Sequence, residues 1–348
     1  MNSKITNTEP IKVNVPDGLK RSLLGDAENF EVLKQNDAKV NFNRFISALI
    51  TGYYEKYQQE TNSRYNRIKS LLSSFILNPQ KLDQATAQIM NEQSKSDYSN
   101  TKTVNNTSFK FHTTKETDSI ILQIEEYRRI TGDSISAYFR KMLYSYINQP
   151  VYEREKIIFQ NNVSVINNAC TLGKKVIFTT RDRPSLLHRV MPYGIRHGQE
   201  ELYNYLLCQE FHKSNGEPLA MSYRLCRIVN PRITSENGQI DSKVMDHLFK
   251  MEKYAPQYLI NEDVESCVEF TANGRKSFMR LYQGRPVVDG KEAEDSDGNI
   301  RCYFSCSQEQ PYLYFRRFNP GEISVLYPEK LKKRLYEFHY QHLCALKT

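Results

Sequence analysis

The stretch from Tyr203 to Pro231 has the sequence Y-N-Y-L-L-C-Q-E-F, a polar segment around Asn215-Gly216, and then S-Y-R-L-C-R-I-V-N-P. Its apolar and aromatic residues recur at close to the period of two that half-buried strands require. The Asn-Gly pair is typical of a tight turn, so the stretch predicts a β-hairpin. Its second strand is expected to project Arg224 and Arg227 beside several tyrosines. Two cations next to aromatic hydroxyls suit a phosphate or a nucleotide backbone better than an apolar metabolite.

The bulk composition is that of a moderately basic globular protein. The 348 residues suffice for two or three domains, and the formal net charge of +8 favours an anionic partner. Seven cysteines, odd in number and without a Cys-x-x-Cys pair, indicate reduced thiols in a cytoplasmic protein. The first ten residues lack the apolar segment of a signal peptide, and no stretch has the ~20 apolar residues of a membrane span. We therefore expect a soluble, cytoplasmic protein.

A strand followed by two helices is predicted twice in the first 150 residues. The first copy covers residues 11–53, and the second, stronger copy covers residues 108–147. In the second copy, Phe109 and Phe111 point to one face of the strand, and Gly132 and Ser134 end one helix and cap the next.

This order resembles the ribbon-helix-helix fold of DNA-binding proteins, in which two strands pair into a ribbon that enters the major groove. A single ribbon strand cannot bury its apolar face alone, so two copies in one chain suggest an intramolecular pseudo-dimer. The alternative is a helical scaffold or dimerisation element that no longer contacts bases, because the ribbon carries little charge. The candidates for facing DNA are Lys12, Asn14, Lys110 and His112.

Three further segments are predicted around these copies. Residues 60–77 should form a helix that Pro79 ends, and residues 94–107 should form a polar linker. Residues 151–173 should form a connecting helix.

The region from Lys174 to Pro231 resembles the WYL domain, a small Sm-like β-barrel of bacterial regulators. The Arg-Leu-x-Arg-Ile run is the most specific match, and Asn204 replaces the tryptophan of the family signature. The matching segments are Val176-Ile-Phe-Thr, His188-Arg-Val-Met-Pro192-Tyr-Gly-Ile, Asn204-Tyr205-Leu206 and Tyr223-Arg224-Leu225-Cys226-Arg227-Ile228.

The remainder of the chain resembles the C-terminal extension that often follows WYL domains, a small ferredoxin-like unit. The resemblance runs from Val268 to Arg280 and from Pro320 to Leu331, and it implies a homodimer formed through this extension. A final amphipathic helix is predicted, with its core-facing residues at Leu331, Leu335, Phe338 and Leu343. The expected architecture is an α+β multidomain protein with a tandem ribbon-helix-helix-like domain over 1–150, a connecting helix over 151–173, a WYL domain over 174–262 and the extension over 263–348.

The WYL resemblance implies that a basic pocket binds a ligand or nucleic acid. Arginines can hold a phosphate while tyrosine rings stack on bases, which suits single-stranded RNA. For either arginine taken singly, and for Arg224 in particular, the alternative is a structural ion pair with a carboxylate. The pocket candidates are Arg224, Arg227, His188, Arg189, Tyr193, Tyr205 and Ser185.

The domain order resembles that of the WYL accessory proteins of type VI-D CRISPR systems, which are implied to bind RNA and to enhance an RNA-targeting effector. The other hypothesis is a DNA-binding transcription regulator whose WYL domain senses a nucleotide or oligonucleotide. No catalytic arrangement, cofactor motif or metal signature is found, so an enzyme is not expected. His339-x-x-His342 is interpreted as a pair of helix-surface histidines. The Asp295-Ser-Asp297-Gly298 run lacks the downstream glutamate of a calcium loop and is interpreted as a polar hairpin tip.

Overall fold

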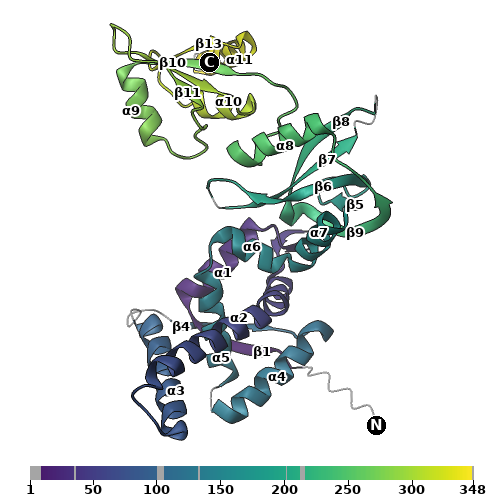
Figure 1. Ribbon diagram of the computed structural model, residues 1–348, viewed down its shortest axis with the longest axis vertical. Helices are drawn as coiled ribbons and strands as arrows, with labels where there is room; N and C mark the ends of the chain where they lie inside the picture. Colours follow the sequence, from purple (N-terminus) through teal and green to yellow (C-terminus); the bar gives the residue numbers. More distant parts are fainter. Residues whose placement is uncertain are drawn as a thin grey trace. The chain divides into compact units, whose positions relative to one another are not determined.

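The computed structural model describes residues 9–34, 37–99, 106–131, 134–200, 202–211 and 216–346. The chain divides into two units, Met1–Gln160 and Asn161–Thr348, and both are of the α+β class (Figure 1). The predicted turn at Gly132, the hairpin-tip residue Asn215 and residues 100–105 of the polar linker lie outside the described residues.

A two-stranded antiparallel ribbon lies in the N-terminal unit. Strand β1 (Ile11–Pro16) pairs with β4 (Asn106–Phe111), so that Lys12 lies opposite Lys110. Alternation places the apolar side chains of both strands in the core and their polar side chains outside. The buried residues are Val13, Val15, Phe109 and Phe111, and the exposed ones are Lys12, Asn14 and Lys110.

Two helices follow each ribbon strand. After β1 come α1 (Asp17–Asn29), the short strands β2 (Leu33–Lys34) and β3 (Asp37–Val40), and α2 (Phe42–Leu72); after β4 come α4 (Lys115–Thr131) and α5 (Ile135–Ile147). The side chains of Asn41 and Ser134 cap α2 and α5 by accepting the backbone N–H of Arg44 and Ala137, each at 3.1 Å. The helices bury one aromatic core with the ribbon, which includes Phe30, Phe45, Tyr53, Phe139 and Tyr146.

The helices between and after the two copies differ from the prediction. Helix α2 is continuous through the two predicted helices, and Pro79 begins α3 (Pro79–Ser99) instead of ending a helix. Proline suits the first turn of a helix because its missing N–H would have no partner there. The Tyr65 hydroxyl donates to Asp83 at 2.8 Å and ties α3 to α2.

Two helices replace the predicted connecting helix. Helix α6 (Val151–Ile158) packs Ile157 and Ile158 into the core of the N-terminal unit, and α7 (Gln160–Leu172) precedes the first strand of the C-terminal unit.

Five antiparallel strands form the first sheet of the C-terminal unit, in the order β8-β7-β6-β5-β9. Pro192 lies within β6, where the register with β7 shifts between Pro192 and Gly194. Asn204, at the signature's tryptophan position, is fully buried. The strands are β5 (Lys174–Thr180), β6 (His188–His197), β7 (Asn204–Phe211), β8 (Pro218–Arg224) and β9 (Ile228–Asn237).

The predicted hairpin is formed by β7 and β8, but its second strand is shorter and earlier than expected. Phe211 pairs with Pro218 and Tyr205 pairs with Arg224, which is the last residue of β8. Arg227 lies on a 3₁₀ turn (Leu225–Arg227) that leads into β9, so the two arginines do not share one strand.

Helix α8 (Ser242–Tyr254) follows, and a second antiparallel sheet has the strand order β11-β12-β10-β13. Leu331 and Leu335 of the last helix are buried in the core of the C-terminal unit, as predicted. Leu343 was predicted to face the same core, but it is 51% exposed. No described helix is long and apolar enough to cross a membrane. The other elements are β10 (Ser266–Phe270), α9 (Ala272–Arg280), β11 (Gly290–Lys291), β12 (Ile300–Phe304), α10 (Glu309–Phe315), β13 (Ile323–Tyr327) and α11 (Glu329–Ala345).

Candidate functional site

A pocket of about 790 Å³ lies at the β8 side of the five-stranded sheet. This volume is within the range of about 300 to 1,000 Å³ that is usual for small-molecule sites. We call it the arginine pocket, after the three arginines in its lining. The lining residues are Thr180, Asp182, Arg183, Leu186, His188, Tyr205, Glu210, Phe211, Leu219, Met221, Ser222, Tyr223, Arg224, Arg227 and Gln257.

The arginines reach the pocket from three different places in the fold. Arg224 ends β8 and its guanidinium lies 3.7 Å from the ring centroid of Tyr203, an arrangement that combines stacking with a cation–π attraction. Arg227 is exposed on the 3₁₀ turn, and its carbonyl accepts the backbone N–H of Arg181 at 3.1 Å. This bond holds the loop after β5, and with it Arg183, next to the turn.

Three hydrogen-bonded side chains form one wall of the pocket. Nδ1 of His188 lies 3.1 Å from a carboxylate oxygen of Glu210 and 3.0 Å from the Tyr223 hydroxyl, which donates to the same carboxylate. The ring of His188 stacks on Phe178 with centroids 5.3 Å apart. Burial and the hydrogen bond to Glu210 raise the pKa of Tyr223 well above its usual value, so this hydroxyl stays protonated. The wall is thus rigid and polar.

Asp182 is an exposed carboxylate that lines the pocket together with the arginines. A hydrogen bond from the Thr180 side chain, with smaller contributions from Arg183 and Arg227, holds the pKa of Asp182 below its usual value. Asp182 and Arg183 are 59% and 71% exposed, and their charged atoms are 3.9 Å apart. Ion pairs this exposed are weak, so Arg183 can exchange this contact for an anionic ligand.

Four of the seven predicted pocket residues line the arginine pocket: Arg224, Arg227, His188 and Tyr205. Arg189 instead donates to Glu236 at 2.6 Å, and the Tyr193 hydroxyl donates to Glu252 at 2.6 Å. Ser185 is exposed on the loop between β5 and β6 and is not among the described lining residues. Arg189 thus makes an ion pair with a carboxylate, the kind of structural pairing that was considered for the arginines of the pocket.

Sequence reasoning did not select Arg183, Glu210 or Tyr223 for this site. Tyr223 belongs to the quoted Arg-Leu-x-Arg-Ile segment, and it could have been found from that position. Arg183 lies on a loop without periodic pattern, and the role of Glu210 depends on strand register.

A second hollow, of about 570 Å³, lies on the outer face of the ribbon. It is lined by Lys12, Asn14, Thr107, Ser108 and Arg140. Two of the four residues predicted to face DNA therefore share this hollow, and Lys110 lies directly opposite Lys12 in the ribbon. His112 is exposed just beyond β4, where its backbone N–H donates to the Asn43 side chain at 2.7 Å.

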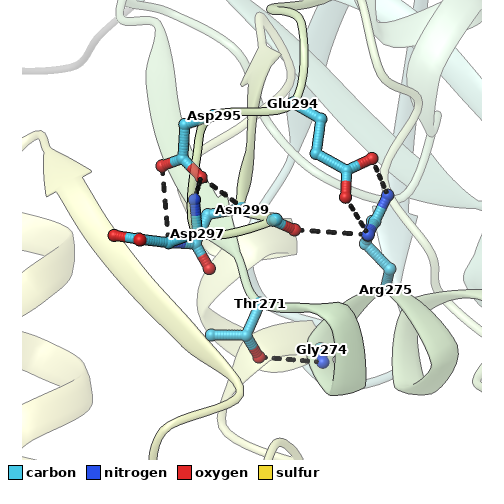
Figure 2. Close-up of polar contacts among 8 residues, drawn as sticks. Thr271, Gly274, Arg275, Glu294, Asp295, Asp297 and Asn299 are labelled. Carbon is cyan, nitrogen blue, oxygen red and sulfur yellow. Dashed lines mark hydrogen bonds and ion pairs between the residues drawn. The ribbon is translucent and has the colours of Figure 1, made fainter.

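The polar run around Asp295 is a hydrogen-bonded turn (Figure 2). A single carboxylate oxygen of Asp295 accepts the backbone N–H groups of Asp297 and Asn299 at 3.0 and 2.8 Å. Arg275 donates to both carboxylate oxygens of Glu294, at 3.1 and 3.0 Å, and fixes the turn to α9. Within the described ranges, no group of three or more histidine, cysteine or acidic side chains is placed to hold a metal ion.

Comparison with solved structures shows a shared fold. A crystal structure of a CRISPR Cas-related protein has a TM-score of 0.70 with this chain at 16% sequence identity, and the match covers 97% of this chain and 94% of the other. The proteasome accessory factor B/C (PafBC) of Arthrobacter aurescens matches with a TM-score of 0.24 and 13% identity over 66% of this chain and 35% of that one, which is too low to carry an argument. No family model and no curated protein sequence matches the chain.

Proposed function

We propose that this chain is a non-enzymatic, cytoplasmic accessory protein of a CRISPR system that binds single-stranded RNA in the arginine pocket. The convergence of Arg183, Arg224 and Arg227 on one tyrosine-lined pocket carries the proposal. The fold shared with a CRISPR Cas-related protein supports it. In this proposal the five-stranded sheet is a WYL barrel of the Sm-like type, the N-terminal unit is a tandem ribbon-helix-helix and the second sheet belongs to a ferredoxin-like extension.

The chemistry of the pocket suits a nucleotide chain. Guanidinium groups match the geometry of a phosphate, and the backbone of single-stranded RNA presents one phosphate per nucleotide. The rings of Tyr205 and Tyr223 offer surfaces on which bases stack, at about 1 to 3 kcal/mol per base. Such contacts tolerate different sequences because every base has a π-face.

Removal of two pocket cations tests the RNA-binding proposal. Arg224→Ala combined with Arg227→Ala should weaken binding of a single-stranded RNA at least tenfold. Two lost phosphate contacts should also lower the slope of log K against log salt by about 1.4, at ~0.7 per contact. The matched control is Arg189→Ala, which removes an arginine of the same sheet outside the pocket and should leave affinity unchanged. An unchanged affinity in the double variant would overturn the pocket assignment.

We further propose that the RNA-bound protein enhances an RNA-targeting effector of the same system. Addition of this protein to the effector encoded beside it should increase target RNA cleavage. The pocket double variant should lose that increase. If the wild-type protein and the double variant stimulated cleavage equally, the enhancement would not depend on RNA binding in the pocket.

A DNA-binding transcription regulator is the second candidate, and the ribbon supports it. Lys12 and Lys110 lie opposite each other on an exposed face, where like charges destabilise the strand pair unless an anion neutralises them. Arg140 lies at the same hollow. Under this proposal the ribbon would contact an operator and the arginine pocket would sense a nucleotide.

A homodimer formed through the C-terminal extension completes the proposal. Helix α11 exposes Tyr336, Tyr340 and Leu343, and the adjacent strand β13 lies at the edge of its sheet and exposes Leu326 and Tyr327. The rings of Tyr336 and Tyr340 stack with centroids 6.0 Å apart and form an exposed aromatic surface on α11 that a second copy could cover.

Substitution on this surface tests the dimer. Tyr340→Arg should convert a dimer into a monomer in light scattering. Tyr282→Arg, at a tyrosine that is 77% exposed outside α11 and β13, is the control and should not change the mass. A monomeric wild-type protein would contradict the proposed dimer.

A further inference from the structure

The guanidinium of Arg224 has an aromatic support behind it. Its carbon lies 3.7 Å from the centroid of the Tyr203 ring, the shortest of the cation–ring distances in the described part of the chain. Tyr203 directly precedes β7, and Arg224 ends the neighbouring strand β8. The contact therefore joins the two ends of the hairpin that carries the pocket.

The two members of this stack have different positions relative to the arginine pocket. Arg224 is a lining residue, whereas Tyr203 is not among the described lining residues. Tyr203 thus contacts the arginine rather than the space in which a ligand would lie. When a planar guanidinium stacks on a ring, the ring covers one of its faces, and its N–H groups point outward in the plane of the guanidinium.

We propose that Tyr203 is a positioning residue, which holds the plane of the Arg224 guanidinium so that its N–H edge meets a phosphate of the bound RNA. The inference rests on the proposed RNA-binding function. An arginine held in this way loses less rotamer freedom on binding than a free side chain does. A lysine ammonium has no plane to stack, so Arg224→Lys would not be held in this way.

A double-mutant cycle tests whether Tyr203 acts through Arg224. The probe is a labelled single-stranded RNA of about 12 nucleotides, within the range of one small-barrel site. Tyr203→Leu should weaken binding roughly tenfold, as expected for the loss of a partly buried cation–π contact, and Tyr203→Phe should restore affinity. In an Arg224→Ala background, Tyr203→Leu should cause no further loss. Additive losses would mean that Tyr203 contacts RNA itself and would overturn the proposal.

Tyr312→Leu is the matched control, because Arg334 lies 3.9 Å from the Tyr312 ring outside the pocket. This variant removes a similar stack and should leave RNA affinity unchanged. An equal loss at Tyr312→Leu would assign the effect to general destabilisation and would contradict the proposal.

A measurement without RNA separates this inference from the proposed function. In NMR spectra of the free protein, the Arg224 Hε resonance should be shifted by the ring current of Tyr203 in the wild type and in Tyr203→Phe. The shift should disappear in Tyr203→Leu. An identical resonance in all three proteins would overturn the positioning role. A wild-type protein that shows the shift but binds no RNA would instead overturn the proposed function.

Discussion

Asp26 is a buried acid. Burial disfavours its charged form, and an ion pair with Arg154 favours it. Its carboxylate is 5% exposed, and Nη1 of Arg154 lies 3.2 Å from it. Burial raises the pKa of Asp26 from 3.8 to about 6, although the guanidinium of Arg154 lowers it. The folded state therefore binds a proton that the unfolded chain releases at lower pH.

The stability of the N-terminal unit should depend on this proton. Between about pH 4 and pH 6 the folded state binds more protons than the unfolded state, so the free energy of unfolding falls as pH rises through this window. A difference of 2.2 between the pKa values 6 and 3.8 corresponds to about 3 kcal/mol. Asp26→Asn should flatten this slope in urea titrations, whereas Asp17→Asn, at an acid of the same helix whose side chain is 44% exposed, should not. Parallel slopes in the wild type and Asp26→Asn would contradict this account.

Two helical glycines should respond in opposite directions to alanine. A Cβ at Gly52 of α2 would lie 2.1 Å from the carbonyl oxygen of Ile157 on α6, whereas a Cβ at Gly25 of α1 would meet no atom within 4 Å. Gly52→Ala should destabilise the protein by roughly 1 to 3 kcal/mol because the helices must separate. Gly25→Ala should stabilise it by roughly 0.5 to 1 kcal/mol through helix propensity. Thermal unfolding measures both, and a tolerated Gly52→Ala would refute the close approach.

The ribbon shows what can be predicted at the scale of elements. Alternation correctly placed Phe109 and Phe111 on the buried face of the ribbon and Lys12 and Lys110 on its exposed face. The pattern did not reveal that α2 is continuous or that Pro79 begins α3, because a run of polar helical residues has no strong period at its ends. Helix boundaries therefore required the structure.

The ribbon lysines distinguish the two candidate functions. Lys12→Ala with Lys110→Ala should leave RNA affinity nearly unchanged if the arginine pocket binds RNA. If the ribbon binds an operator, the same double variant should lower the slope of log K against log salt by about 1.8 for double-stranded DNA, at ~0.9 per phosphate contact. Filter binding with both nucleic acids provides the comparison. If the double variant lost RNA binding and kept its DNA binding unchanged, both assignments of the ribbon would be contradicted.

At the scale of the whole molecule, each unit has a core of its own. The core of the N-terminal unit is built from residues between Val13 and Ile158, and the main core of the C-terminal unit is built from residues between Leu207 and Leu335. A fragment of residues 1–160 should therefore unfold cooperatively in urea, with the helical circular dichroism of a folded protein. The fragment of residues 161–348 is measured in the same way for comparison. A gradual, non-cooperative loss of signal from the first fragment would show that its core depends on the rest of the chain.

The sequence by itself determined the local elements of this protein and the chemistry of one hairpin. Alternating residues predicted β1, β4, β7 and part of β8, because side-chain direction in a strand depends only on neighbouring positions. The Arg-Leu-x-Arg-Ile segment indicated Arg224 and Arg227 as pocket candidates, and both line the arginine pocket. Only the tertiary structure brought His188, Glu210 and Arg183 to that pocket and sent Arg189 and Tyr193 to other partners. Strand register and loop path decide these contacts, and both depend on residues that are distant in the sequence.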